Sequence, residues 1–222
     1  MKAVSAAFAL GLMAGAAVSA AHAQSSPWSL HAGVAHVRFS PTVDLSVAGQ
    51  PVPDAGVRLD ANRTAAVEIA YDLDTRWSLR MALGVPPTTT LRTAGSLSAL
   101  VPPLTGKLGE VKYAPVVPSV TYRLLTEGPV RPYVGLGLNY MKVLATPDGD
   151  LAHMDVEDAW GTVLQAGFDV PLNPRWSIFL DARRMRIKTT ATGTLTALGG
   201  LPVRGEVNLR PTVIFAGLGY RF

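Results

Sequence analysis

The residues of this 222-residue sequence that could support acid–base or nucleophilic chemistry are few and scattered. A serine hydrolase needs a histidine beside a serine and a third group that orients the histidine. The spacing offers only His36 with Ser40, or His153 with the acidic residues around it. Neither combination has an orienting partner placed by a shared element, so the sequence predicts a protein that is not an enzyme.

Metal, cofactor and nucleic-acid sites are not indicated either. The sequence has no cysteine and no His-x-x-x-His pair, which removes the common thiolate and histidine motifs for metals. Acidic residues gather between 148 and 158, but their spacing does not match a calcium loop, so we expect a solvated loop and no cofactor. A net charge of +4, spread along the chain without a basic cluster, predicts no nucleic-acid partner.

Seven charged residues could still act together if the fold brings them to one place. They are Glu68, Arg80, Arg123, Asp169, Asp181, Arg183 and Arg221. Their chemistry would be ion pairing inside a protein, and the elements that could position them decide whether they meet.

The N-terminal segment must be set aside before those elements are sought. Lys2 is followed by an uncharged, alanine-rich run that ends in Ala21-His22-Ala23. A basic start, an apolar middle and an A-x-A site predict a signal peptide at 1–23, cleaved after Ala23. A permanent membrane anchor is the alternative. The remaining domain spans 24–222.

That domain shows apolar residues at every second position. In its last segment, Ile214 and Leu218 fall on one side of an extended strand, and Gly217 and Arg221 fall on the other. Segments of about 9–11 residues with one apolar face are typical of strands that cross a membrane at a tilt. Eight segments have this pattern: 28–39, 63–71, 77–85, 112–124, 132–144, 159–170, 176–188 and 209–222. The sequence therefore predicts an all-β protein, an eight-stranded antiparallel transmembrane β-barrel.

The connections between these segments alternate in length, which supports the barrel. Short ones (72–76, 125–131 and 171–175) alternate with long ones (40–62, 86–111, 145–158 and 189–208). Bacterial outer membrane barrels have short periplasmic turns and long outer loops. Aromatic residues gather at the expected interfaces: Trp28, Tyr71, Trp77, Trp176, Tyr220 and Phe222 at periplasmic ends, and Tyr140 and Trp160 at outer ends.

The first short turn gives an expected strand register. If Tyr71 lies opposite Trp77, then Glu68 faces Arg80 directly inside the barrel.

The third short turn gives a second register. If Val170 lies opposite Trp176, then Gln165 faces Asp181, and Arg183 follows on the same side. Because small barrels are filled by side chains and buried charges must be paired, the seven charged residues predict a closed floor near the periplasmic end. A selective polar pathway is the alternative.

The outer half of the lumen is expected to be apolar. Its inward-facing residues include Val117, Met141, Val163, Met185 and Val213. An apolar chamber above a charged floor suits a small hydrophobic ligand, although plain packing of the lumen would use the same residues.

Prolines fall on neighbouring strands at the outer side. They are Pro86, Pro87, Pro115 and Pro118. Proline cannot donate to a strand ladder, so these residues predict a weak seam and a lateral opening from lumen to membrane. The alternative is that they only start a long loop.

Several local motifs give the chain a family resemblance over most of its length. They are PYVGLGLNY at 132–140, AWG at 159–161 leading to QAGFD at 165–169, LNPRW at 172–176, TTA at 189–191 and GYRF at 219–222. In these motifs the chain resembles the outer membrane protein W (OmpW) family of eight-stranded barrels.

The resemblance implies an outer membrane location, contact with outer membrane lipid, and a narrow lumen that passes small hydrophobic molecules; relatives include facilitators of alkane uptake. It also implies that Tyr220 and Phe222 are read by the barrel assembly machinery. Arg183-Arg184 stand where relatives carry aromatic residues, which would make this lumen more polar. The alternative function is a closed barrel that presents its outer loops, 40–62 and 86–111, to partners without transport.

Overall fold

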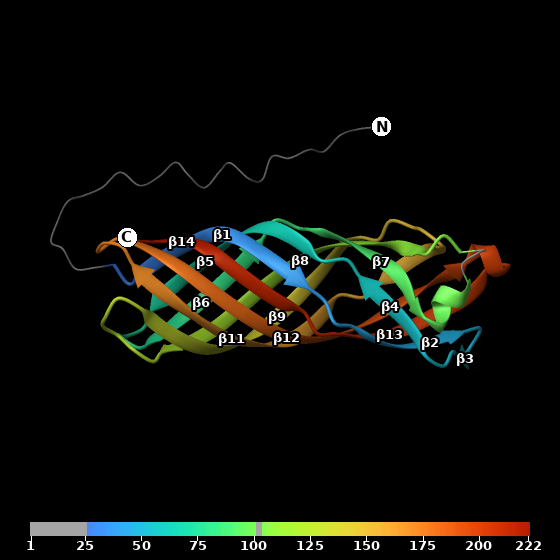
Figure 1. The fold of residues 1–222 in the computed structure, drawn as a ribbon, viewed down its shortest axis with the longest axis horizontal. Coiled ribbons are helices and arrows are strands. Elements are labelled where there is room, and N and C mark those ends of the chain that lie inside the picture. The colour runs from blue at the N-terminus through green and yellow to red at the C-terminus, as the bar shows by residue number, and fades with distance from the viewer. Residues whose placement is uncertain (1–25, 101–103) are drawn as a thin grey trace, which may run out of the picture.

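The computed structural model describes residues 26–100 and 104–222, so the predicted signal peptide lies outside the described residues. Eight antiparallel strands form a closed ring in the order β1-β5-β6-β8-β9-β11-β12-β14, and β14 pairs back to β1. They are β1 (Trp28–Arg38), β5 (Asn62–Asp72), β6 (Trp77–Gly84), β8 (Lys107–Arg123), β9 (Arg131–Ala145), β11 (Ala159–Pro171), β12 (Trp176–Leu195) and β14 (Thr212–Arg221). Figure 1 shows these strands wrapped into a cylinder and tilted against its long axis, which confirms the predicted fold class.

The two faces of the strands have the predicted characters. Leu136 on β9 and Leu218 on β14 are 65% and 50% exposed on the outside, whereas Phe215 on β14 is 2% exposed in the lumen. Because strand residues alternate between faces, the outward apolar positions meet lipid and the lumen takes the residues between them.

Aromatic residues at the membrane interfaces form direct cross-strand pairs. Their ring centroids lie 4.8–4.9 Å apart in the pairs Trp28–Tyr71, Trp77–Tyr122, Tyr140–Trp160 and Trp176–Tyr220. Each pair also lies in register across two neighbouring strands, so the rings support strand pairing as well as the interface.

The outward face changes character sharply toward the outer end. In the described barrel strands, the outward positions between the periplasmic aromatic rings and this level carry no Asp, Glu, Lys or Arg. Exposed basic side chains then follow on six segments around the barrel: Arg38, Arg63, Lys112, Lys142, Arg184, Arg186, Lys188 and Arg210. We call this set the basic rim. It marks the outer edge of the apolar band.

The first periplasmic turn differs from the predicted register by two residues. Leu73 N–H donates to Trp77 O, and Tyr71 lies opposite Leu79 instead of Trp77. The reason is a three-residue loop in which the Asp74 carboxylate accepts the backbone N–H groups of Arg76 and Trp77. Glu68 therefore does not face Arg80 directly.

The third periplasmic turn repeats this geometry. Asn173 accepts the N–H groups of Arg175 and Trp176, so Val170 lies opposite Ile178. Gln165 consequently lies opposite Arg183. The predicted partner, Asp181, is two residues away on the same strand. A shift by two residues keeps every side chain on its predicted face.

Much of the four long connections is strand and not loop. They contain β2 (Thr42–Val47), β3 (Gln50–Pro51), β4 (Ala55–Leu59), β7 (Thr88–Gly95), β10 (Leu151–Val156) and β13 (Leu201–Leu209), with the short 3-10 helices η1 (Ser96–Leu100) and η2 (Thr196–Leu198). No helix in the described ranges is long and apolar enough to cross a membrane.

These strands extend the barrel wall beyond the basic rim, at the end opposite the C-terminus (Figure 1). They were not predicted because most of them are short and they lie in segments rich in glycine and proline, although Val43, Leu45 and Val47 alternate with polar residues.

Candidate functional site: the barrel lumen

Glu68 on β5 is the centre of an ion-paired cluster that crosses the lumen. Its Oε1 accepts a hydrogen bond from Arg80 Nη1 at 2.9 Å, and its Oε2 accepts one from Arg183 Nη2. Arg183 Nε also donates to Asp181 Oδ1 at 2.7 Å. All four residues are buried. We call Glu68, Arg80, Asp181 and Arg183 the inner floor.

Neutral residues give the inner floor further hydrogen bonds. Tyr133 Oη and Gln165 Nε2 each donate to Asp181 Oδ2 at 2.7 Å. The Arg80 guanidinium lies 4.1 Å from the centroid of the Tyr133 ring, and its Nε donates to Thr121 Oγ1. Ion pairs together with these hydrogen bonds offset the desolvation of the buried charges.

Tyr133 is a floor residue that sequence reasoning missed. It lies on the inward face of β9, and the space for its ring exists because residue 167 is glycine. A Cβ on Gly167 would lie 2.6 Å from Tyr133 Oη. The sequence signal for an inward Tyr133 is that it lies on the same strand face as Gly135 and Gly137.

The other predicted floor residues lie toward the periplasm in a looser arrangement. Asp169 Oδ2 lies 3.6 Å from Arg80 Nη2, and its Oδ1 lies 3.6 Å from His31 Nε2. Asp169 therefore borders the inner floor without closing a tight pair.

Arg123 and Arg221 do not reach Glu68 at all. They bind Asp72, with Arg123 Nη2 at 2.8 Å from Oδ1 and Arg221 Nη2 at 2.5 Å from Oδ2. Ser78 Oγ donates to the same carboxylate. The floor is therefore two clusters and not the single one predicted, and Asp72 was not expected in it because the sequence assigns Asp72 to the turn 72–76.

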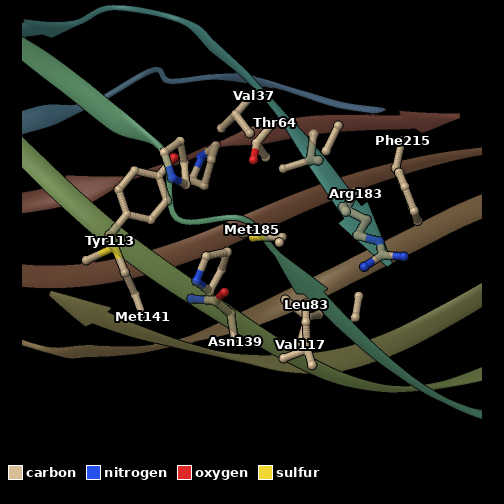
Figure 2. A pocket seen from close by; sticks show the side chains of 18 of the residues that line it. Val37, Thr64, Leu83, Tyr113, Val117, Asn139, Met141, Arg183, Met185 and Phe215 are labelled. Atoms are coloured by element: carbon tan, nitrogen blue, oxygen red, sulfur yellow. The ribbon is translucent and has the colours of Figure 1, made fainter. Parts of the chain in front are cut away.

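Above the inner floor lies an apolar cavity of about 80 Å³, which we call the lower chamber. Four predicted lumen residues line it: Val117, Met141, Met185 and Val213. Val163 does not line it but belongs to the same buried cluster. Figure 2 shows Arg183 and Phe215 at one side of this chamber and Tyr113 at the other.

A second apolar cavity, the upper chamber, lies among the outer strands. Its walls include Leu45 from β2, Leu59 from β4 and Leu91 from β7. The two chambers share three lining residues, which are Phe39, Tyr113 and Met141. The rings of Phe39 and Tyr113 meet edge to face at 6.3 Å. The outer strands thus continue the apolar lumen past the basic rim.

Two of the four prolines lie where strand β8 changes its pairing partner from β6 to β7. The β6–β8 ladder ends at Leu83–Val116, and the β7–β8 ladder begins at Thr88–Lys112. Pro86 and Pro87 fill the segment between β6 and β7, and Pro87 lines the lower chamber.

The other two prolines lie on β8. Pro115 faces the lower chamber beside this break. Pro118 faces outward, and the pairs Val117–Asn139 and Pro118–Leu138 are missing from the described β8–β9 ladder. Proline has no N–H to donate to the Leu138 carbonyl, which explains the gap.

The remaining candidate residues have structural contacts. His36 Nε2 accepts a hydrogen bond from Arg38 on the outer wall. In the outer acidic segment, Asp148 accepts the N–H groups of Met154 and His153, and these bonds lower the pKa of its carboxyl. No cluster of ligands that could hold a metal ion is found in the described ranges.

Comparison with known proteins identifies the family. The family model described as "OmpW family" matches residues 26–222. The chain belongs to the OmpW family. It is accordingly an outer membrane β-barrel surrounded by outer membrane lipid, which confirms the predicted location.

Individual relatives extend this result. The "Dibenzothiophene metabolism operon protein PahQ" of Pseudomonas aeruginosa is 32% identical over 200 residues, covering 90% of this chain and 90% of that protein. "Outer membrane protein AlkL" of Ectopseudomonas oleovorans is 30% identical over 179 residues, covering 81% and 74%.

Solved structures agree on the architecture of this OmpW-family barrel. The crystal structure of OprG from Pseudomonas aeruginosa superposes with a TM-score of 0.80 at 23% identity, covering 89% of this chain and 97% of that one. AlkL in DMPC bilayers gives 0.65 at 27%, covering 94% and 96%.

Proposed function

We propose that this barrel gives small hydrophobic molecules a passive path from the cell surface into the outer membrane. One observation carries the proposal: two apolar chambers share Phe39, Tyr113 and Met141 and lie above an ion-paired floor. A molecule that enters the upper chamber meets apolar walls until the floor stops it. The chain performs no catalytic step in this path.

The exit in this proposal is lateral. The break between β6 and β7 borders the lower chamber, because Gly84 and Pro87 line it. The interrupted β8–β9 ladder borders it as well, because Val117 and Asn139 line it. A molecule stopped by the floor leaves sideways between strands whose pairing is weakened by Pro86, Pro87, Pro115 and Pro118.

Two further observations support the passage, and a third concerns assembly of the barrel. The outer strands turn apolar side chains into the upper chamber, so the long connections serve the passage more than a role in presenting loops to partners. The name of one relative, a dibenzothiophene metabolism operon protein, refers to a hydrophobic compound. The Phe222 ring is 58% exposed at the periplasmic end and contacts Tyr220 at 5.3 Å, where the barrel assembly machinery would read both.

Uptake of radiolabelled octane tests the passage. Cells that produce the protein should accumulate octane faster than cells that lack it. A variant with Pro86, Pro87, Pro115 and Pro118 replaced by valine or threonine should restore strand pairing and lower this uptake. Pro132→Val, at the periplasmic end of β9, is the matched control and should leave uptake unchanged. Equal uptake with and without the protein refutes the passage, and full uptake by the proline variant refutes the lateral exit.

A further inference from the structure

The amide of Asn139 is a buried polar group in an otherwise apolar wall. The residue is 1% exposed and lines the lower chamber. Neither its Nδ2 nor its Oδ1 has a hydrogen-bond partner among residues 26–100 and 104–222. Buried side-chain amides are nearly always paired, so this one calls for an explanation.

The neighbours of Asn139 explain why the protein itself cannot satisfy it. Gly161 lies directly opposite on β11 and offers no side chain. Gly137 and Met141 flank it on the inward face of β9, and Val117 approaches from β8. Figure 2 shows the Asn139 amide in the same chamber as Met141, Met185 and Val117.

A second unpaired group lies nearby. The Ser119 hydroxyl, one inward position below Val117 on β8, is buried and has no partner in the described part of the chain. Ser119 pairs in register with Gly137, so it borders Asn139 diagonally. The base of the lower chamber thus offers the amide donor and acceptor of Asn139, and the Ser119 hydroxyl lies next to this amide without lining the chamber.

The inner floor does not compete for these groups. Arg183, the charged residue that lines the chamber, is held by Glu68 and Asp181. An anionic ligand would have to break these pairs, whereas a neutral group needs only the unpaired amide. The site therefore favours a neutral oxygen function over a carboxylate.

We propose that Asn139 binds the polar end of a neutral, oxygenated hydrophobic molecule, such as an alcohol or a ketone, at the base of the lower chamber. This inference rests on the proposed function, because it names the class of molecule that the passage selects. The amide donates to the ligand oxygen through Nδ2 and can accept from a hydroxyl through Oδ1.

The size of the chamber agrees with this orientation. Its volume of about 80 Å³ is roughly half that of an engineered cavity of ~150 Å³ that binds benzene. Only the polar end and a few carbons fit before Met141 and Met185 must move, and methionine side chains adapt readily. The rest of the molecule extends past Tyr113 into the upper chamber.

Binding of a matched pair of ligands tests the proposal. The full barrel in lipid nanodiscs is titrated with 1-octanol and with n-octane, and NMR follows the side-chain amide signals of labelled asparagine. In the unaltered protein, 1-octanol should shift the Asn139 amide signals and octane should not. Asn139→Leu should weaken 1-octanol binding by about five- to tenfold, the loss expected for one hydrogen bond, without weakening octane binding.

Met185→Leu is the control for altered packing in the same chamber. It keeps the amide and should change the affinities of both ligands by the same factor. The NMR result on the unaltered protein tests the proposal even if Asn139→Leu fails to fold.

The outcomes separate this inference from the proposed function. If Asn139→Leu changes both affinities equally, or if the amide signals show contact with water alone at saturating 1-octanol, the polar recognition is refuted while the passage stands. If the unaltered barrel binds neither ligand and octane uptake does not depend on it, the proposed function fails.

Discussion

Arg183 and Arg184 are neighbours in the chain, but their side chains lie in opposite environments. Arg183 is buried between Glu68 and Asp181, whereas Arg184 is exposed in the basic rim and donates to Thr212 Oγ1. Arg183→Met should lower the free energy of unfolding by about 3–5 kcal/mol, because buried Asp181 loses its ion pair and buried Glu68 loses one of its two arginine partners.

Arg184→Met is the matched control and should cost less than about 1 kcal/mol, as expected for an exposed polar contact. Urea unfolding of both variants in lipid vesicles measures the difference. Equal losses would show that the inner floor contributes no more than a surface contact.

Gly167 gives a second prediction at the scale of single residues. A Cβ there would lie 2.6 Å from both Tyr133 Oη and the Leu180 carbonyl oxygen, so the wall and the Tyr133 ring would have to move apart. Gly167→Ala should destabilise the barrel by about 1–3 kcal/mol in urea. Gly205→Ala, whose nearest contact would be 3.4 Å, should have a much smaller effect. An unchanged free energy of unfolding for Gly167→Ala would contradict the tight packing described for Tyr133.

At the scale of elements, Asp148 ties β10 to the outer end of the barrel and makes that region sensitive to pH. Hydrogen bonds from Met154 and His153 N–H lower the pKa of Asp148 in the folded protein. A lowered folded pKa stabilises the fold above the unfolded value of about 3.9, and this stabilisation is lost as pH falls through the folded value.

Hydrogen exchange measures this effect. The protection factors of the Met154 and His153 amides should fall as the pH is lowered below about 4, while those of β9 stay constant. Asp148→Asn keeps an acceptor without the charge and should remove the pH dependence. Protection that stays constant in the unaltered protein would contradict the assignment.

Strand faces and strand register could be predicted from the sequence to different degrees. Alternation predicted the face of nearly every strand residue, because one apolar face is forced on any strand that meets lipid. Register was wrong by two residues, since Asp74 and Asn173 each close a loop that alternation does not specify. A two-residue error preserves faces, so Glu68 and Arg80 still meet although they are not directly opposite.

The candidate site was predicted less completely than the fold. The inner floor follows from inward charges, but its separation from the Asp72 cluster depends on side-chain reach, which alternation does not supply. The upper chamber was not predicted because its walls lie in segments that the sequence assigns to the long outer loops. Alternation along β9 places Asn139 on the same face as Gly137, but only three-dimensional contacts show that its amide is unpaired.

At the scale of the whole molecule, the apolar band and the basic rim define how the barrel lies in the membrane. A band about 25 Å tall should separate the periplasmic aromatic rings from Arg186. The sequence has no cysteine, so single cysteines report one position each. Leu136→Cys and Leu218→Cys should resist a water-soluble maleimide in bilayers, and Arg186→Cys should react. Equal reaction at Leu218 and Arg186 would refute this placement.

The closing strands bring residues 26 and 222 side by side. Ser26 N–H donates to the Phe222 carbonyl, and Phe222 N–H donates to the Trp28 carbonyl. A short peptide joining these positions would leave every strand pair intact, while the exposed Gly199-Gly200 tip between β12 and β13 offers a place to open the chain. The barrel is therefore a natural scaffold for circular permutation, in which new ends at the cell surface could carry a fused reporter.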